Sequence, residues 1–169
     1  MEYQVDKLHK NHIFFYDVVQ SLKEQYKETY NVDCTKYDDV FQQYSIKYTY
    51  VMYQKNNLIG FFSISRIDMM KKGWFNKILS FIISLLNRHI YIYDVFVYPE
   101  HRGIGKGVEL VAKALDICFS MLLVNAVRLQ IYDKKLIKFY SKNGFNIIRE
   151  FEKFDLLEYN PQKYIRKMI

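Results

Sequence analysis

A buried strand that leads through a glycine-rich turn into an amphipathic helix is the feature that most constrains this chain. Residues 90–98 are almost continuously apolar and aromatic, which is typical of a strand buried on both faces of a sheet. Gly103, Gly105 and Gly107 follow, three of the six glycines in the protein, and helical periodicity begins among them. A strand followed by a helix in this way predicts a crossover to a later parallel strand. We therefore expect an α/β (α+β) fold around a parallel pair, 90–98 and 126–132.

Hydrophobic periodicity and turn residues predict the other elements. Further strands are expected at Tyr3–Val5, 48–53, 58–67, 145–150 and 164–168, with a hairpin turn at Asn56-Asn57. Helices are expected at 11–30 with Asn11 as N-cap, 38–45, 71–88, 104–122 and 134–142, the last closed by Gly144. The apolar face of 74–86 is interpreted as a helix packed on the core. There are three alternatives for this apolar face. It could form a dimer seam, which would make the protein a homodimer, it could line the substrate channel, or it could contact a membrane surface.

Length, charge and cysteine usage together predict a single-domain protein of the cytoplasm. A chain of 169 residues suits one domain over residues 1–169. The net charge of +7 is dispersed, which favours anionic partners and disfavours a polycationic substrate. Cys34 and Cys118 lie in no metal or redox spacing, so we expect reduced thiols. The N-terminus has no signal pattern, and the apolar run 78–86 is about half the ~20 residues of a membrane span.

The glycine-rich turn has the chemistry of a phosphate-binding site. Glycines let backbone N–H groups approach an anion, and the N-terminus of the following helix adds free N–H donors and a positive dipole end. Lys106 is followed by Gly107 where a P-loop needs Ser or Thr, so that motif is excluded. The spacing also fits a dinucleotide fingerprint poorly. A ligand-free turn stays open as an alternative at this point.

Two segments resemble the motifs of the GNAT acetyltransferases. Residues 92–107 are similar to the family's acetyl-CoA motif, whose hallmark Arg/Gln-x-x-Gly-x-Gly/Ala is met by Arg102, Gly105 and Gly107. Residues 138–145 read Lys-Phe-Tyr-Ser-Lys-Asn-Gly-Phe and are similar to the family's FYxKxGF segment after the fifth strand. The resemblance implies a single N-acetyltransferase domain with a mixed, mostly antiparallel sheet of six to seven strands. It further implies a splayed central parallel pair, helices on both faces, acetyl-CoA as acyl donor and no metal.

The resemblance also implies roles for individual residues. The backbone N–H groups expected to bind the pyrophosphate are those of Arg102, Gly103, Ile104, Gly105, Lys106 and Gly107. Backbone groups around Phe96 and Val97 are expected to hold the pantetheine arm and polarise the thioester carbonyl. Tyr140 takes the place of the family's tyrosine near the cofactor sulfur and is expected to protonate the leaving thiolate. Asp133 replaces an asparagine that contacts the cofactor in many relatives.

The general base is less directly indicated. Asp94 is the first candidate, because a carboxylate in a buried strand is costly unless it is hydrogen-bonded or functional. Glu100, in the following loop, is the second. Some spermidine/spermine-type relatives carry an acidic pair here, where this chain has Tyr93 and Asp94. The histidines show no metal spacing, and His101 is expected at the rim of the cofactor loop.

The expected function is acetyl transfer from acetyl-CoA to a primary amine by direct attack. The acceptor stays open among small amines, an antibiotic, protein amines and aminoacyl-tRNA. Residues 31–34 faintly resemble acetyltransferase toxins that act on charged tRNA, although Thr35 departs from their pattern. One alternative function is a catalytically weak CoA-binding module that regulates or scaffolds a partner. Another is a nucleic-acid-binding protein without CoA chemistry.

Overall fold

The strand, turn and helix expected at the centre of the chain are present in a computed structural model, which describes residues 3–30, 48–65, 89–121 and 124–161. Strand β4 spans His89–Val97, a 3-10 turn η3 spans Pro99–His101, and helix α4 spans Lys106–Ser120. Helix α4 begins two residues later than the periodicity of Ile104 predicts, because Gly103 and Gly105 both adopt positive φ, 76° and 85°. These two glycines make the turn that separates β4 from α4.

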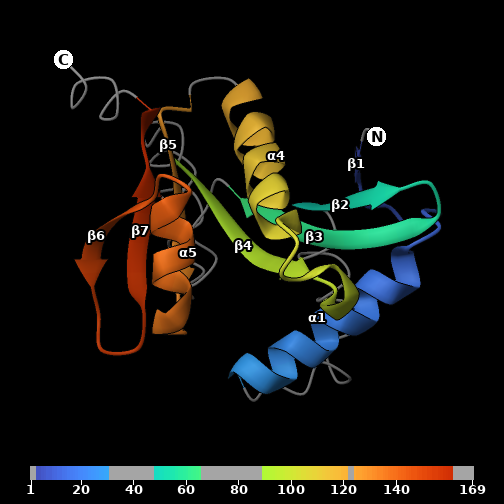
Figure 1. The fold of residues 1–169 in the computed structure, drawn as a ribbon, viewed down its shortest axis with the longest axis horizontal. Helices are drawn as coiled ribbons and strands as arrows, with labels where there is room; N and C mark the ends of the chain where they lie inside the picture. The colour runs from blue at the N-terminus through green and yellow to red at the C-terminus, as the bar shows by residue number, and fades with distance from the viewer. Residues whose placement is uncertain (1–2, 31–47, 66–88, 122–123, 162–169) are drawn as a thin grey trace, which may run out of the picture. The chain divides into compact units, whose positions relative to one another are not determined.

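Seven strands form a mixed sheet in the order β1-β2-β3-β4-β5-β7-β6 (Figure 1). Their bounds are β1 Gln4–Lys7, β2 Thr49–Gln54, β3 Asn57–Ser65, β5 Ala126–Ile131, β6 Asn146–Glu150 and β7 Asp155–Tyr159, with β4 as above. The β4–β5 pair is parallel, whereas β1–β2, β2–β3, β5–β7 and β6–β7 are antiparallel. The fold class, the strand number and the central parallel pair are therefore confirmed.

The chain divides into two compact units that share β4 and α4. One comprises Met1–Ser63 and Asp94–Leu110, and the other comprises Ile64–Tyr93 and Val111–Ile169. The division falls just before Asp94 in β4 and just after Leu110 in α4. The single N-acetyltransferase domain over residues 1–169 stays a prediction.

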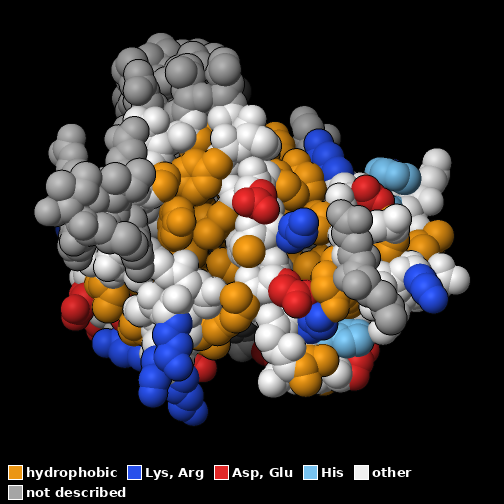
Figure 2. Space-filling view, turned by 45° about the horizontal axis from the view of Figure 1, so that its top comes forward, with side chains coloured by type: hydrophobic (Ala, Val, Ile, Leu, Met, Phe, Trp, Pro, Cys, Tyr) orange, Lys and Arg blue, Asp and Glu red, His pale blue; other side chains and the backbone are white. Residues whose placement is uncertain are grey.

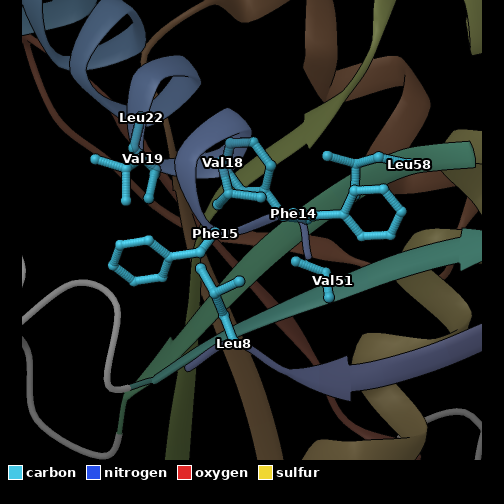
Figure 3. Packing of buried hydrophobic residues seen from close by; sticks show 9 residues of the cluster. Leu8, Phe14, Phe15, Val18, Val19, Leu22, Val51 and Leu58 are labelled. Atoms are coloured by element: carbon cyan, nitrogen blue, oxygen red, sulfur yellow. The ribbon is translucent and has the colours of Figure 1, made fainter. Parts of the chain in front are cut away.

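Helix α1, Phe15–Tyr30, covers the core of the first unit. Its apolar residues recur at helical spacing, and Phe15, Val18, Val19 and Leu22 are all buried. They form one buried cluster with residues of strands β2 and β3 (Figure 3); the cluster also contains Leu8, Phe14, Val51, Leu58 and Phe61. This packing fixes the orientation of α1, so that its remaining side chains meet β4 at defined positions.

The second unit contains the hairpin of β6 and β7, of which β7 was not predicted. The segment Asp155–Tyr159 carries two acids, which obscured its strand character in the sequence. Glu158 is nevertheless buried, because it lies directly opposite Arg128 of β5 and accepts a hydrogen bond of 2.9 Å from its guanidinium. The strand is therefore held by an ion pair that no local pattern reveals.

Several boundaries differ from the sequence predictions. Helix α1 begins at Phe15, so Asn11 is not its N-cap; the imidazole of His12 instead accepts from the N–H of Phe14 at 3.3 Å. The hairpin register pairs Gln54 with Asn57, so the turn is Lys55-Asn56. A 3-10 turn η4, Lys134–Leu136, precedes helix α5, Ile137–Lys142, where one helix was expected. The elements predicted at 38–45, 71–88 and 164–168 lie outside the described residues.

The surface agrees with a dispersed charge. Figure 2 shows lysine and arginine side chains at several separate places on one face, with apolar and acidic side chains between them. Among the described residues, none of the helices has the length and apolar character that crossing a membrane requires.

Strand β3 meets the end of β4 at Gly60 without room for a side chain. A Cβ at Gly60 would overlap the carbonyl oxygen of Phe96 and lie 3.3 Å from the Cα of Val97. The N–H of Tyr98 donates to the carbonyl of Ile59 at 3.0 Å, which holds the two backbones together. A glycine in the interior of a buried strand is thus explained by close backbone approach.

We predict that Gly60→Ala lowers the free energy of unfolding by roughly 1–3 kcal/mol, because the methyl group displaces the backbone of β4. Urea denaturation measures this loss. The control is Asn57→Ala, an exposed substitution in the same strand, which should change stability by less than about 0.5 kcal/mol. Equal stability of Gly60→Ala and wild type would contradict the close approach.

Candidate active site

The turn before α4 presents a row of unpaired backbone N–H groups. Within the described chain, none of the N–H groups of residues 103–107 donates to another backbone carbonyl. A Cβ added at Gly103 or at Gly105 would meet no atom within 4 Å, so both glycines face open space. The N–H of Arg102 is already occupied, since it donates to the carbonyl of Pro99 at 3.2 Å. The turn can therefore bind an anion through residues 103–107.

The Arg102 side chain ties this turn to the end of β4. Its Nε donates to the carbonyl of Val97 at 2.8 Å, and its guanidinium lies 5.3 Å from the centre of the Phe96 ring. Arg102, the arginine of the motif, thus holds the turn to the end of β4 while its side chain remains exposed to solvent.

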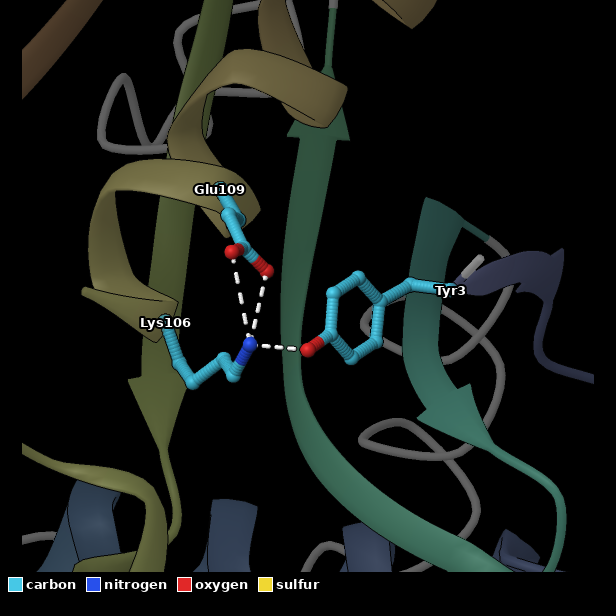
Figure 4. A network of polar contacts seen from close by, with 3 residues as sticks. All are labelled: Tyr3, Lys106 and Glu109. Carbon is cyan, nitrogen blue, oxygen red and sulfur yellow. Dashed lines mark hydrogen bonds and ion pairs between the residues drawn. The ribbon is translucent and has the colours of Figure 1, made fainter. Parts of the chain in front are cut away.

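Lys106, the first residue of α4, is held by two partners (Figure 4). Its Nζ forms an ion pair with Glu109 at 3.1 Å and donates to the hydroxyl of Tyr3, whose ring centre lies 4.0 Å away. These contacts raise the pKa of Lys106, the Tyr3 hydrogen bond most of all, so the side chain stays charged beside the unpaired amides. The backbone N–H of Lys106 belongs to the row, while its ammonium group contacts Glu109 and Tyr3.

Phe96 and Val97 lie where β4 ends. The ring of Phe96 stacks on Phe61 with 5.2 Å between the ring centres, which fixes the backbone on both sides of it. The parallel ladder with β5 is limited to residues 89–91 of β4 and 126–128 of β5. The later part of β4, which includes both predicted pantetheine-binding residues, thus lies beyond the ladder.

Asp94 combines a buried carboxyl with an unusual backbone. It is 8 % exposed and has a φ of 53°, one of two positive-φ residues other than glycine in the described chain. Such a conformation costs about 1–2 kcal/mol for an L-residue, although aspartate tolerates it better than most. Burial raises the pKa of the Asp94 carboxyl to about 7, while hydrogen bonds from Tyr26 and Ser63 oppose that rise. A carboxyl that titrates near neutral pH has the property that a general base requires.

Tyr140 lies on α5 in the second unit and is also buried. Its ring makes edge contacts with Phe139 and Phe145, with 5.0 and 5.7 Å between ring centres. Gly144, with a φ of 88°, ends the helix, and the N–H of Phe145 donates back to the carbonyl of Tyr140 at 3.1 Å. Burial raises the pKa of Tyr140 to about 12, so the phenol keeps its proton at neutral pH.

Two acidic residues of the predicted site remain, Asp133, expected near the cofactor, and Glu100, the second candidate for the general base. The carboxylate of Asp133 accepts from the N–H of Lys135 at 3.0 Å and so caps η4. Asparagine can make the same cap, which explains how either residue suits this position. Glu100 is exposed on the turn η3.

Sequence reasoning missed two residues that contact Asp94 and one that contacts the end of β4. Gly60 carried a readable signal, a glycine inside an apolar strand. Tyr26 lies in the predicted helix 11–30 and Ser63 in the predicted strand 58–67, and neither pattern distinguishes these residues from their neighbours. Their hydrogen bonds to Asp94 join residues far apart in the sequence, and no local pattern predicts such pairs.

Comparison with known proteins identifies a protein family and a shared fold. Residues 15–145 match the family model described as the Acetyltransferase (GNAT) family. A search of curated proteins finds no match. A spermidine N-acetyltransferase chimera of Vibrio cholerae SpeG and hSSAT is similar in structure, with a TM-score of 0.68, 16% identity, and coverage of 98% of this chain and 99% of that one.

Two further solved structures are similar over nearly their whole length. The PaiA N-acetyltransferase of Thermoplasma acidophilum, in complex with coenzyme A, has a TM-score of 0.61, 16% identity, and coverage of 95% and 99% of the two chains. A GNAT-family acetyltransferase of Staphylococcus aureus Mu50 has a TM-score of 0.64, 15% identity, and coverage of 94% and 99%. At these identities the structures establish a shared fold. Because the family model spans most of the sequence, this chain belongs to the GNAT acetyltransferase family.

Proposed function

We propose that this protein transfers an acetyl group from acetyl-CoA to a primary amine by direct attack of the amine on the thioester. The observation that carries the proposal is the row of unpaired N–H groups at residues 103–107, in a chain of an acetyltransferase family. Acetyl-CoA supplies the activated acyl group. The residues of the chain bind it, orient it and move protons.

The row of N–H groups is suited to a diphosphate. Five successive amides at a helix N-terminus combine hydrogen-bond donors with the positive end of the helix dipole. Arg102 and Lys106 add positive charge beside them without occupying the donors. The Thermoplasma acidophilum enzyme named above was solved with coenzyme A, as was an N-acetylglutamate synthase of Neisseria gonorrhoeae, which supports this ligand.

Asp94 is proposed as the general base. An amine must lose a proton as it attacks, and a carboxylate with a pKa of about 7 is about half ionised at neutral pH. Its positive φ is a form of backbone strain that concentrates at functional sites. Backbone groups of Phe96 and Val97 are proposed to hold the pantetheine arm and to polarise the thioester carbonyl.

Tyr140 is proposed as the general acid. When the carbon–sulfur bond breaks, its phenol donates a proton to the departing sulfur, which leaves CoA as a thiol. A pKa of about 12 ensures that the proton is present at neutral pH. Cys118 is unsuited to forming an acyl-enzyme, because burial raises its pKa to about 12 and so suppresses the nucleophilic thiolate.

The acceptor is proposed to be a primary amine without a polycationic chain, since the net charge of +7 disfavours polyamines. Incubation with acetyl-CoA and a panel of small amines, peptide amines and aminoacyl-tRNA should release CoA with one of them. Tight CoA binding without turnover on any acceptor would favour the regulatory module over the enzyme.

We predict that Gly105→Ala weakens CoA binding at least about tenfold, because a side chain at a φ of 85° forces the amides to turn. Isothermal calorimetry measures the dissociation constant. Gly144→Ala imposes a similar strain at a φ of 88° in the other unit and should leave CoA affinity unchanged. Equal affinities of wild type and Gly105→Ala would remove the turn from the binding site.

We predict that Tyr140→Phe lowers kcat by about 10²-fold with an unchanged dissociation constant for acetyl-CoA, because only proton donation is lost. Steady-state kinetics and calorimetry measure the two quantities. Tyr132→Phe removes a phenol at the end of β5 and should retain wild-type kcat. If kcat of Tyr140→Phe equals that of wild type, the acid is another group.

We predict that Asp94→Asn abolishes turnover yet stabilises the protein at pH 8 by roughly 2–4 kcal/mol. The folded-state pKa of about 7 lies above the ordinary 3.8, so wild-type stability falls as pH rises from about 4 to 7, and the amide removes this loss. Asparagine also tolerates the positive φ. Urea denaturation at pH 4.5 and pH 8 tests the effect; a gain of equal size at both values would contradict a raised pKa.

A further inference from the structure

The Asp94 carboxyl is held by hydroxyl groups from two separate elements of the first unit. The hydroxyl of Tyr26, on α1, donates to Oδ2 of Asp94 at 3.4 Å. Ser63, on β3, also hydrogen-bonds this carboxyl. No charged side chain of the described residues acts on it. Among the described residues, the groups that stabilise the ionised carboxylate are these two neutral hydroxyls.

Ser63 is itself supported from behind. Its hydroxyl lies 2.7 Å from that of Thr49 on β2, and both side chains are fully buried. Either hydroxyl can donate in this bond, so Thr49 can donate its proton to the oxygen of Ser63. Tyr26 contacts the Asp94 carboxyl from a different element, helix α1. The Tyr26 side chain is half-buried, whereas that of Asp94 is buried.

Helix α1 makes a second polar contact just beyond the end of β4, with Tyr98, that does not involve Asp94. The hydroxyls of Ser21 and Tyr98 lie 2.9 Å apart, and Ser21 lies about one and a half helical turns before Tyr26. The Ser21–Tyr98 contact is the shorter of the two. Because α1 has this contact and also packs apolar side chains into the core of the first unit, it keeps other attachments when the Tyr26 hydroxyl is removed.

We propose that Tyr26 is a positioning residue which orients the Asp94 carboxylate and sets the pH range in which it accepts a proton from the amine. The inference rests on the proposed role of Asp94 as general base. A hydrogen bond to the charged form of a carboxyl lowers its pKa, and Tyr26 supplies the larger of the two such contributions. Without the Tyr26 hydroxyl, Ser63 is the remaining group that opposes the rise in the pKa of Asp94 caused by burial.

The test is Tyr26→Phe, which removes only the hydroxyl from a ring that packs against the core of the first unit. The ¹³C resonance of the Asp94 carboxyl, followed through a pH titration of the free protein, should titrate about 0.5–1 pH unit higher than in wild type. The acidic limb of kcat/KM should move by the same amount. At pH 7 kcat/KM should then fall roughly two- to fivefold, and at pH 9 it should recover.

Ser21→Ala is the matched control, because it removes the hydroxyl contact of α1 with Tyr98 and leaves Asp94 untouched. It should keep the wild-type titration and pH profile even if it lowers thermal stability. An unshifted Asp94 resonance in Tyr26→Phe overturns the inference. A loss of activity that is equal at pH 7 and pH 9 overturns it as well, since that result indicates a purely structural role.

These outcomes are separable from failure of the base assignment. If Asp94→Asn keeps wild-type turnover, Asp94 is not the base and the role of Tyr26 in catalysis falls with it. If Asp94→Asn is inactive while Tyr26→Phe titrates like wild type, the base stands and only the positioning role is wrong.

Discussion

The departure of β4 from regular strand geometry at Asp94 is the constraint on which the site depends. At this residue φ becomes positive, and from here the strand belongs to the first unit. Its later backbone approaches β3 so closely that only glycine fits at position 60. Backbone sterics and burial thus act together in one short segment, which carries the buried Asp94 carboxyl and, two and three residues later, Phe96 and Val97.

The turn then follows from the way in which β4 ends. Arg102 bonds to the carbonyl of Val97, and Lys106 is fixed by Glu109 and Tyr3, so both ends of the loop are held by side chains. Two glycines of the loop have positive φ, and in the described part of the chain the N–H groups of residues 103–107 donate to no backbone carbonyl. Unpaired amides cost stability in a folded protein unless water or a ligand satisfies them. Their presence at a helix N-terminus is the physical basis for proposing an anionic ligand.

Much of the frame was predictable from the sequence because its determinants are local. The buried strand 90–98, the glycines of the turn and the helix end at Gly144 each express a property of neighbouring residues. The parallel pair followed from the order of these elements. Strand β7 was missed because the burial of Glu158 depends on Arg128, thirty residues earlier. Tyr26, Ser63 and Gly60 were missed as partners of β4 for the same reason, since only the tertiary fold brings them to it.

The central claim is that the amides of residues 103–107 bind the diphosphate of acetyl-CoA. The most direct measurement follows the backbone ¹H–¹⁵N resonances of the protein as coenzyme A is added. The account predicts that the amide protons of Gly103 to Gly107 move downfield and saturate together with binding. Binding that leaves those resonances in place while others shift would contradict it.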